Sequence, residues 1–478
     1  MQNNSKSVWI MLMAALLLLI ICMGIIPFYD TSEPRYAQIA RVMAESGDWI
    51  TPWFSPGVPF WGKPPLSFWA QALSMKAFGF TEFAARFPSL MCLILSIGAL
   101  FAGLRRLEGA CVGLWAALVY TTCALVYVSS AAVVTDPFLA LGTTLSMVSF
   151  AVSVRERNCG WWPYGFFLGL VIGLLAKGPL AAVLSFAPVA VWYVFNRKTT
   201  ALGKALPWGK GMALVAALTL PWYILAEAKT PGFLDYFIVG EHFRRFLDPG
   251  WQGDLYGWAH KRTYGTIWLY WLQASFPWGV LMLAAMAGAL RSVRLRAALK
   301  TVGANPLFSF WMASTLVTPL FFTFSANILL TYVLPSLAGF SVLAALVINQ
   351  SYGNPGVSSR RLLPVAGLIP VVGLVFSVIV WINPNLHKTE RELIRYTQQR
   401  GDAAIPLAYL SEPPFSAQFY SGGKVRTITQ SDLAQPKNLG APFYLAIPKN
   451  QQTTVAELLG KPLEQLYANK RYVLVKIE

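Results

Sequence analysis

The chain has 478 residues, of which 56% are hydrophobic, 14% aromatic and only 12% charged. That composition excludes an ordinary soluble enzyme and is typical of a protein that crosses a membrane several times. The formal net charge of +17 would suit a nucleic-acid-binding protein, but the positions of the basic residues indicate an orientation in a membrane instead.

Eleven apolar stretches are long enough to cross the roughly 30 Å core of a bilayer as helices. They cover residues 8–28, 86–104, 110–130, 137–154, 162–176, 179–196, 211–228, 265–290, 306–324, 328–348 and 362–382. The first run is too long for a signal peptide and no small-residue cleavage site follows it, so we expect it to remain as a span.

The basic residues between these stretches divide into two sets. With the N-terminus in the cytoplasm, the first set falls on the cytoplasmic side, as the positive-inside rule requires: Lys6, Arg105, Arg106, Arg155, Arg157, Arg197, Lys198, Lys204, Lys210, the basic residues from Arg291 to Lys300, Arg360 and Arg361. The second set lies on the opposite face: Arg35, Arg41, Lys63, Lys76, Arg86, Lys177, Lys229, Arg244, Arg245, Lys261 and Arg262. Because orientation alone disfavours the second set, it predicts an anionic ligand on the outer face.

The loop between the first two spans is too long for a simple connection. Thr31 or Ser32 can cap a helix that has Pro34 in its first turn and Gly47 as its stop. Apolar side chains recur at helical spacing: Tyr36, Ile39, Ala40 and Met43. We therefore expect an amphipathic helix on the membrane surface.

Two acids, Asp30 and Glu33, flank the start of this helix, and Arg35 follows them. The exposed N–H groups of a helix start, together with Arg35, suit a phosphate, and a neighbouring carboxylate can take a proton or orient an acceptor. Lys63 precedes Pro64–Pro65, which restrict the local backbone and can fix the direction of the ammonium.

Charged residues also occur beside later spans. Asp136 in VVTDPFLAL and Lys177 in LLAKGPL lie next to apolar stretches, where an unpaired charge costs at least a few kcal/mol. We expect them to pair with each other or with a ligand. Tyr332 in ILLTYVLP places a hydroxyl near the outer end of a span, although a packed core tyrosine is the better explanation of that residue taken alone.

A second outer loop, residues 229–264, contains the sequence EHFRRF. Glu241, His242, Arg244 and Arg245 lie there beside aromatic residues. Because guanidinium groups match the geometry of phosphate, this segment is a candidate phosphate site.

The composition becomes soluble after Trp381. We expect a transmembrane domain over residues 1–382 and a small α/β domain over residues 383–478 on the outer face. Strands are predicted at PLAYL, APFYLAI and RYVLVKIE, and helices at KTERELIRYTQQR and TTVAELLGKPLEQLY.

The sequence contains no GxGxxG after a predicted strand, no Walker A motif and no Cys/His cluster with metal-ligand spacing. We therefore expect no cofactor and no metal, and the activated substrate must supply its own energy. A sugar linked through phosphate to a membrane lipid fits that requirement. Cysteines fall in or beside predicted spans and are interpreted as packing residues: Cys22, Cys92, Cys111, Cys123 and Cys159.

Five segments, DTSEPRYAQIARVMAESGDWITP, WGKPPLSFW, LAKGPL, GEHFRRFLDPGW and TYVLPSLAG, resemble the membrane-embedded glycosyltransferases of the GT-C fold. The branch is the one that includes the lipid A aminoarabinose transferase and, more distantly, the protein O-mannosyltransferases. The resemblance covers most of the chain. It implies an α-helical polytopic membrane protein with about 11 transmembrane helices and interfacial helices in the first outer loop.

In that family a first-loop carboxylate serves catalysis and basic residues of the outer loops hold a polyprenyl phosphate. By resemblance, the matching positions here are Glu33, Arg35, Tyr36, Lys63, Asp136, Lys177, Arg245 and Tyr332. Many members have Asp-Glu where this chain has Ser32–Glu33, so either Glu33 or Asp30 is the expected catalytic carboxylate. Gly62 stands where the aminoarabinose transferases usually have Glu, which weakens the assignment of that sugar.

We interpret the chain as an inverting, metal-independent glycosyltransferase. It would move a sugar from a polyprenyl-phosphate-linked donor to a lipid A-like glycolipid, a protein or another acceptor. The reaction would occur at the periplasmic face of a bacterial inner membrane, with the N-terminus cytoplasmic and the C-terminal domain periplasmic. Its expected partners are therefore the donor, the acceptor and the lipid bilayer, and not nucleic acid.

Two other classes of protein remain as alternatives. A transporter or flippase of lipid-linked saccharides would show repeated halves and helices broken near mid-membrane, whereas the halves here are unlike and the charges lie in outer loops. A binding or assembly protein acting mainly through residues 383–478 would need a concentrated polar site in that region, which the sequence lacks.

Overall fold

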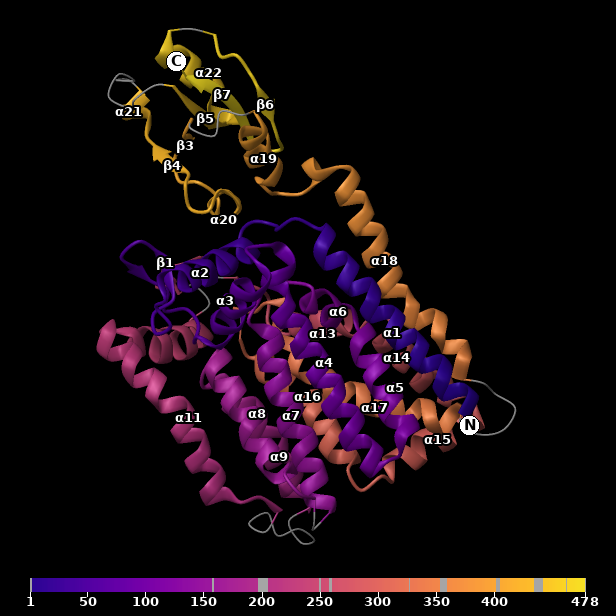
Figure 1. The fold of residues 1–478 in the computed structure, drawn as a ribbon. Helices are drawn as coiled ribbons and strands as arrows, with labels where there is room; N and C mark the ends of the chain where they lie inside the picture. Colours follow the sequence, from indigo (N-terminus) through magenta and orange to yellow (C-terminus); the bar gives the residue numbers. More distant parts are fainter. Residues whose placement is uncertain are drawn as a thin grey trace.

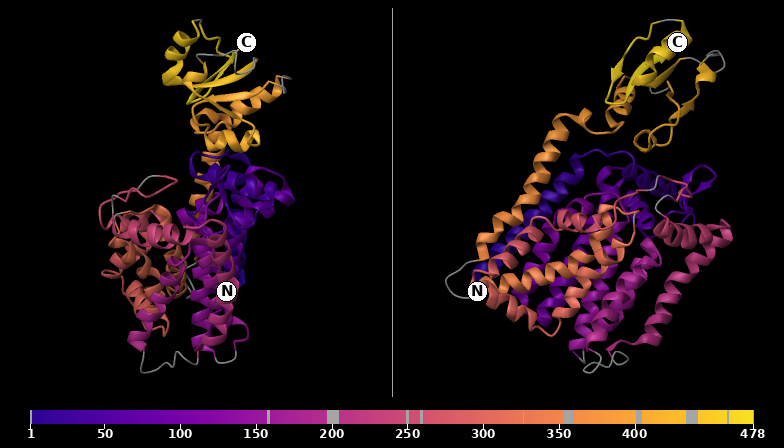
Figure 2. Two further views of the ribbon diagram at one scale, coloured as in Figure 1. Left: turned by 90° about the vertical axis from the view of Figure 1, so that its left-hand side faces the viewer. Right: turned by 180° about the vertical axis from the view of Figure 1, so that it is seen from behind.

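The computed structural model describes residues 2–156, 159–196, 205–248, 251–257, 260–325, 327–352, 359–400, 405–433, 442–460 and 462–477. Within these residues, a helical body carries a smaller domain formed by the C-terminal part of the chain (Figure 1; Figure 2). The basic positions Arg157, Arg197, Lys198 and Lys204 lie outside the described residues.

Every apolar stretch predicted from the sequence coincides with a helix or a pair of helices. Six helical runs among the described residues are long enough to cross a membrane: α1 (Gln2–Ile25), α4 (Glu82–Leu107), α7 (Asp136–Arg155), α11 (Trp208–Lys229), the 3-10 helix η2 (Leu330–Ser336) continued by α17 (Leu337–Tyr352), and η3 (Ser359–Leu362) continued by α18 (Leu363–Ile382). Three bent pairs are α5 (Ala110–Thr122) with α6 (Ala124–Ser130) at 71°, α13 (Thr266–Ser275) with α14 (Trp278–Ala289) at 99°, and α15 (Val293–Gly303) with α16 (Phe308–Thr323) at 91°. Two shorter apolar helices are α8 (Trp162–Lys177) and α9 (Leu180–Asn196). The predicted polytopic helical class is confirmed.

Helices α7 and α8 pack closely because glycines face each other between them. A Cβ on Gly142 of α7 would lie 2.5 Å from the carbonyl oxygen of Gly169 of α8, and small residues commonly permit such approach between membrane helices. Helix α7 begins at Asp136 and α8 ends at Lys177. The close pair therefore brings these two charged residues to the same end of the helical body.

The first outer loop folds into a compact unit. It comprises α2 (Ser32–Ser46), the hairpin strands β1 (Trp53–Ser55) and β2 (Val58–Pro59), and α3 (Leu66–Phe78). The predicted helix and its stop are confirmed, because Gly47 is left-handed (φ 72°) and its N–H donates to the Met43 carbonyl. The predicted cap is wrong: within the described residues, the Thr31 side chain makes no capping hydrogen bond and Ser32 already belongs to the helix.

The apolar face of α2 is buried under protein. Ile39, Ala40 and Met43 share a cluster with Phe68 of α3 and with Phe419 of the C-terminal domain. A prediction from periodicity alone placed this face against lipid, because the α3 and C-terminal segments that cover it are distant in sequence. The expected helix is therefore present, but these residues of its apolar face are covered by protein.

The second outer loop begins with the π-helix η1 (Asp235–Arg244), which is followed by the short helix α12 (Arg245–Leu247). π-Helical turns are rare and are frequently found at functional sites. Here Glu241, His242 and Arg245 are partly buried, whereas Phe243 and Arg244 are exposed.

The C-terminal domain contains a mixed sheet of order β4-β3-β5-β7-β6, in which β3 is parallel to β4 and β5 and β7 is antiparallel to its neighbours. Its strands are β3 (Leu407–Leu410), β4 (Arg426–Ile428), β5 (Phe443–Pro448), β6 (Tyr467–Ala468) and β7 (Tyr472–Ile477), and its helices are η4 (Pro384–Leu386), α19 (Arg391–Gln399), α20 (Phe415–Ser421), α21 (Gln430–Leu433), η6 (Lys449–Gln451) and α22 (Gln452–Leu459). The three predicted strands are confirmed. The last predicted helix is too long, because Gly460 ends α22 in a left-handed conformation (φ 63°) and β6 follows.

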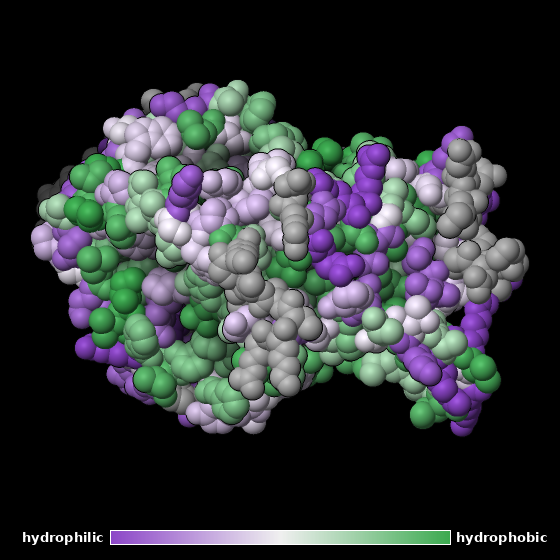
Figure 3. Space-filling view, turned by 90° about the horizontal axis from the view of Figure 1, so that it is seen from below, coloured by the Kyte–Doolittle hydropathy of each residue, from purple (hydrophilic) through white to green (hydrophobic). Residues whose placement is uncertain are grey.

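The end of the helical body away from the C-terminal domain carries the amphipathic helix α15 (Figure 1). Its Ala298 and Val302 are buried, whereas Arg294, Arg296 and Lys300 are exposed. On this side of the molecule, hydrophilic side chains are interspersed with hydrophobic ones (Figure 3). The basic residues of α15, predicted to face the cytoplasm, thus lie opposite the C-terminal domain.

Candidate functional site

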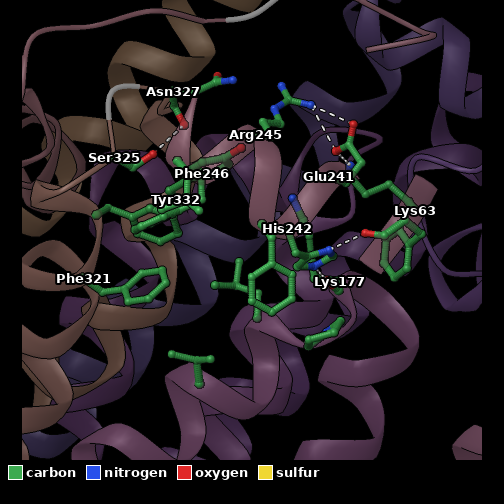
Figure 4. Close-up of a pocket in the computed structure, with 17 residues that line it drawn as sticks. Lys63, Lys177, Glu241, His242, Arg245, Phe246, Phe321, Ser325, Asn327 and Tyr332 are labelled. Carbon is green, nitrogen blue, oxygen red and sulfur yellow. Dashed lines mark hydrogen bonds and ion pairs between the residues drawn. The ribbon is translucent and has the colours of Figure 1, made fainter. Parts of the chain in front are cut away.

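A cavity of about 350 Å³ opens between the two outer loops and the adjoining helix ends. Its walls are formed by Lys63, Lys177, Pro179, Leu180, Val183, Phe237, Glu241, His242, Phe243, Arg245, Phe246, Leu247, Phe321, Phe322, Ser325, Asn327 and Tyr332. Arg245, Glu241 and Lys63 lie toward one side, and aromatic and aliphatic side chains such as Phe321 lie toward the other (Figure 4). The cavity is therefore amphipathic.

The paired ends of α7 and α8 supply one charged part of the cavity. Lys177 Nζ lies 3.0 Å from Asp136 Oδ1, so these residues pair with each other, which was one of the two expected outcomes. The same ammonium lies 5.8 Å from the ring centroid of Tyr332. Gly178 has φ 71°, and a Cβ there would lie 2.6 Å from the Phe237 ring; the glycine after Lys177 thus lets η1 pack against the end of α8.

Glu241 joins the two outer loops. Its carboxylate lies 3.5 Å from Lys63 Nζ and 3.1 Å from Arg245 Nη1, and that guanidinium also lies 3.3 Å from Asp254 Oδ2. Burial alone would raise the pKa of Glu241, but Lys63 and Arg245 hold it below its ordinary value. Each of these cations thus already has a carboxylate partner.

Two hydrogen-bond donors of the cavity wall have no partner among the residues that the structure describes. They are Arg245 Nε and Asn327 Nδ2, both buried. The Asn327 amide is oriented because its Oδ1 accepts a hydrogen bond of 3.0 Å from the His260 N–H. Since buried polar groups are nearly always hydrogen-bonded, these two donors indicate a ligand with acceptor oxygens.

His242 ties η1 to the end of α8. Its Nδ1 lies 2.7 Å from the Phe237 carbonyl and its Nε2 lies 3.0 Å from the Lys177 carbonyl. Burial lowers the pKa of His242 below its ordinary value, against the effect of these two carbonyl acceptors. The imidazole therefore fixes the backbone beside Lys177.

Helix α2 places Arg35 and Tyr36 next to this charged cluster. Arg35 Nη1 donates to the Tyr256 carbonyl at 2.5 Å, and its Nε is buried without a partner within the protein. Burial would raise the pKa of the Tyr36 phenol, but Arg35, Lys63 and Lys177 together hold it below its ordinary value. The electrostatic potential at Tyr36 is thus positive, as a site for an anion requires.

Glu33 is held on the membrane-domain side. Arg86 Nε lies 2.6 Å from Glu33 Oε1 and Arg86 Nη2 lies 2.8 Å from Oε2, and the Val133 N–H donates to Oε1 at 3.2 Å. The pair is largely buried, with 3% of the Arg86 side chain and 13% of the Glu33 side chain exposed. The carboxylate is therefore fixed in position by three donor groups.

Asp30 is held from the opposite side, by the C-terminal domain. Its Oδ1 accepts a hydrogen bond of 2.9 Å from the Ser416 N–H, and its Oδ2 lies 2.6 Å from Arg471 Nη2. With 4% of its side chain exposed, Asp30 is buried rather than solvated.

The structure brings most of the predicted site residues together, but not all. The cavity lining includes Lys63, Lys177, Glu241, His242, Arg245 and Tyr332, and Asp136 contacts it through Lys177. Among the described lining residues neither Glu33 nor Asp30 occurs, and Arg244 is exposed outside them.

The sequence analysis did not identify four residues that take part in these contacts: Arg86, Asp254, Asn327 and Arg471. Arg86 was among the basic residues predicted on the outer face, but the sequence did not indicate its partner. Asp254 lies in the charged second loop, whereas nothing in the sequence around Asn327 or Arg471 indicates a role. Among the described residues, no three His, Cys, Asp or Glu side chains converge to hold a metal ion.

Comparison with known proteins identifies relatives. Residues 6–237 match the family described as dolichyl-phosphate-mannose-protein mannosyltransferase. An undecaprenyl phosphate-alpha-4-amino-4-deoxy-L-arabinose arabinosyl transferase of Erwinia tasmaniensis is 28% identical over 74% of this chain and 62% of its own length. A protein of the same name from Edwardsiella ictaluri is 31% identical over 70% of this chain and 57% of its own length. The chain thus spans less than two thirds of these relatives.

Solved structures show the same fold. ArnT from Cupriavidus metallidurans bound to undecaprenyl phosphate aligns with a TM-score of 0.76 and 16% identity over 99% of this chain and 98% of that one. The apo oligosaccharyltransferase of Archaeoglobus fulgidus aligns with a TM-score of 0.51 and 10% identity over 95% and 71%. The fold expected from the resemblance is confirmed.

Replacing Arg86 tests the buried ion pair. Arg86→Ala leaves the Glu33 carboxylate buried without its partner, so we expect a loss of about 3–5 kcal/mol, measured by thermal unfolding of the purified protein in detergent. Arg106→Ala, in the same helix, removes a pair with Glu156 that is 39% and 30% exposed and should cost at most about 1 kcal/mol. Equal losses in both variants would contradict the assignment.

Proposed function

From this likeness in sequence and fold to lipid-phosphate-dependent sugar transferases, we propose that the chain is a membrane glycosyltransferase. It moves a sugar from a polyprenyl-phosphate-linked donor to a lipid A-like glycolipid, a protein or another acceptor. The observation that carries the proposal is the amphipathic cavity, because a polyprenyl phosphate has the same division between an anionic head and an apolar chain. The relatives are named as undecaprenyl phosphate-aminoarabinose transferases and the ArnT structure is bound to undecaprenyl phosphate, which supports the same ligand class here.

The phosphate lies, in this proposal, between Lys63, Lys177 and Arg245. Arg245 Nε and Asn327 Nδ2 supply hydrogen bonds that no described protein group accepts. Because Glu241, Asp254 and Asp136 already pair with the three cations, an arriving phosphate must displace these carboxylates or share the cations with them. The site therefore releases the phosphate more readily than an unpaired cluster of cations would.

The proposed sugar transfer requires the site to hold the leaving group and the acceptor next to each other. The acceptor oxygen attacks the anomeric carbon from the face opposite the phosphate, the carbon–oxygen bond to the phosphate breaks, and its electron pair leaves with the polyprenyl phosphate. Fixed cations stabilise the charge that develops on the leaving oxygen. A carboxylate takes the acceptor proton or orients the acceptor, and the configuration at the anomeric carbon is inverted.

Glu33 is the proposed catalytic carboxylate. Arg86 fixes its direction, and Arg35 and Tyr36 follow it along α2, near the cations of the cavity. Asp30 is the alternative. Both acids are engaged by protein donors, but the side chain of Asp30 is 4% exposed and that of Glu33 is 13% exposed, so Glu33 is the more accessible of the two.

The proposed location is the periplasmic face of a bacterial inner membrane. Helix α15, whose basic residues are exposed, lies at the end of the helical body away from the C-terminal domain, which supports a cytoplasmic N-terminus and a periplasmic C-terminal domain. The comparisons give no support to the transporter or flippase alternative.

Removing cavity donors tests the phosphate site. Arg245→Ala and Asn327→Ala should each reduce retention of undecaprenyl phosphate by about tenfold, since a hydrogen bond to a charged group contributes about 1.5–3 kcal/mol. Retention is measured by mass spectrometry of lipid that copurifies with the detergent-solubilised protein. Lys449→Ala, on the exposed surface of the C-terminal domain, should retain the lipid. Normal retention in both cavity variants would place the phosphate elsewhere.

Replacing each first-loop acid by its amide tests the carboxylate. Glu33→Gln should keep undecaprenyl phosphate and lose sugar transfer by about 100-fold or more, because the amide cannot take a proton. Asp30→Asn should have the smaller effect. Transfer is followed by mass spectrometry of glycolipids from cells that carry each variant in place of the native gene. An inactive Asp30→Asn beside an active Glu33→Gln would assign the role to Asp30, and full activity in both would reject a carboxylate mechanism.

Cysteine labelling tests the orientation. In a Cys111→Ser background, a cysteine replacing exposed Ser431 should react with a membrane-impermeant thiol reagent in intact spheroplasts. A cysteine replacing exposed Thr301 of α15 should react only after lysis. The reverse pattern would place the cavity in the cytoplasm.

A further inference from the structure

The C-terminal domain contacts Asp30, just before the start of α2, the helix that carries Glu33. We propose that this domain positions the first outer helix for catalysis through Arg471, a guanidinium that Asp30 and Glu390 share. Arg471 is then a positioning residue, acting through Asp30 on the residues that follow it. This inference rests on the proposed transfer reaction.

The three side chains form one buried ionic cluster. Arg471 Nη2 lies 2.6 Å from Asp30 Oδ2 and 2.7 Å from Glu390 Oε1, and Arg471 Nε lies 3.1 Å from the same Glu390 oxygen. The side chain of Asp30 is 4% exposed and that of Glu390 is 0% exposed. Because one guanidinium serves two buried carboxylates, its loss would leave both without a cation.

The cluster is rigid on the side of the C-terminal domain. Asn469 Nδ2 donates to Glu390 Oε2 at 2.7 Å, and the Tyr409 hydroxyl donates to the same oxygen at 3.3 Å. Asn469 Oδ1 also accepts the N–H of Arg471 at 2.8 Å, which fixes the turn before β7. Burial raises the pKa of Glu390 to about 7, although Arg471 opposes that effect. The guanidinium is thus presented to Asp30 in one orientation.

The chain around Asp30 is held by both its main chain and its side chain. The Asp30 N–H donates to the Lys388 carbonyl at 2.9 Å, and the Asp30 carboxylate accepts from the N–H and the hydroxyl of Ser416. Three residues later, Glu33 is held by Arg86 of α4. The first turn of α2 is therefore fixed between the C-terminal domain and the helical body, and a shift of Asp30 would alter the geometry of Glu33.

A second set of contacts docks the domain independently of Arg471. The Tyr420 hydroxyl accepts the Phe28 N–H at 2.9 Å and donates to Glu82 Oε1 at 2.9 Å. Arg391 lies 3.3 Å from the same Glu82 oxygen, and Arg41 Nη1 donates to the Phe419 carbonyl at 2.8 Å. Replacement of Arg471 should therefore leave the domain docked through α20. Asp30 would keep its hydrogen bonds with Ser416 and Lys388 but lose the cation that fixes its carboxylate, which should loosen the start of α2.

The experiment compares Arg471→Gln and Arg471→Lys with a control, Arg395→Gln, all in the full-length protein. Arg395 lies in the same domain with 54% of its side chain exposed. Hydrogen–deuterium exchange is measured on peptides covering residues 29–36 and residues 415–421. Sugar transfer is measured as turnover of a lipid-linked sugar donor, undecaprenyl phosphate-alpha-4-amino-4-deoxy-L-arabinose, onto lipid A, and as sugar-modified glycolipid in cells. Retention of undecaprenyl phosphate reports on the donor site.

We expect Arg471→Gln to increase exchange at residues 29–36 and to lower kcat by at least about tenfold, because small misplacements of reacting groups are costly. The donor KM and lipid retention should stay within about twofold, and exchange at residues 415–421 should not change. Arg471→Lys should recover at least about half of the activity, and Arg395→Gln should match the native protein.

Three results would overturn the inference. Unchanged exchange at residues 29–36 together with unchanged transfer would show that Arg471 does not position α2. Increased exchange at residues 415–421 with loss of retained lipid would show that Arg471 only holds the domain in place. Faster exchange at residues 29–36 in a protein whose native form transfers no sugar in either assay would reject the proposed function, and the catalytic role of Arg471 with it.

Discussion

The ion pair between Arg86 and Glu33 is the interaction on which the outer face of the molecule depends. Arg86 also donates to the Met23 carbonyl at 2.9 Å and to the Ile26 carbonyl at 2.6 Å, at the end of α1. One guanidinium thus joins α1, α2 and α4 where the chain leaves the helical body. Since a buried charge is tolerated only when it is paired and hydrogen-bonded, the pair fixes the direction in which α2 starts and, with it, the position of Arg35 and Tyr36 near Lys63 and Lys177.

The charges that line the cavity are also paired with one another. Lys63, Lys177 and Arg245 each have a carboxylate partner, and Asp254 adds a third acid, so the charges of the cavity are close to balanced. An anionic ligand would gain hydrogen bonds from Arg245 Nε and Asn327 Nδ2 but would compete with these acids. That balance suits the proposed binding, transfer and release of a lipid phosphate.

The C-terminal domain packs against the first outer loop. Phe419 enters the apolar cluster that also contains Ile39 and Met43 of α2, and Arg471 pairs with Asp30 just before the helix begins. The start of α2 is therefore held by the helical body on one side and by the C-terminal domain on the other. This two-sided support would keep the proposed catalytic carboxylate in a fixed position on a loop.

The sequence by itself determined the helical spans, the boundary signals of α2 and three strands of the C-terminal sheet, because hydrophobic length, Gly stops and alternation are local properties. It also identified the cavity residues Lys63, Lys177, Glu241 and Arg245, since charges beside apolar spans are costly without a partner. Only the tertiary structure decided the pairings. Arg86 meets Glu33 and Arg471 meets Asp30 across 53 and 441 residues of chain, and no local pattern encodes which of many buried charges will be neighbours once the helices and the domain have packed.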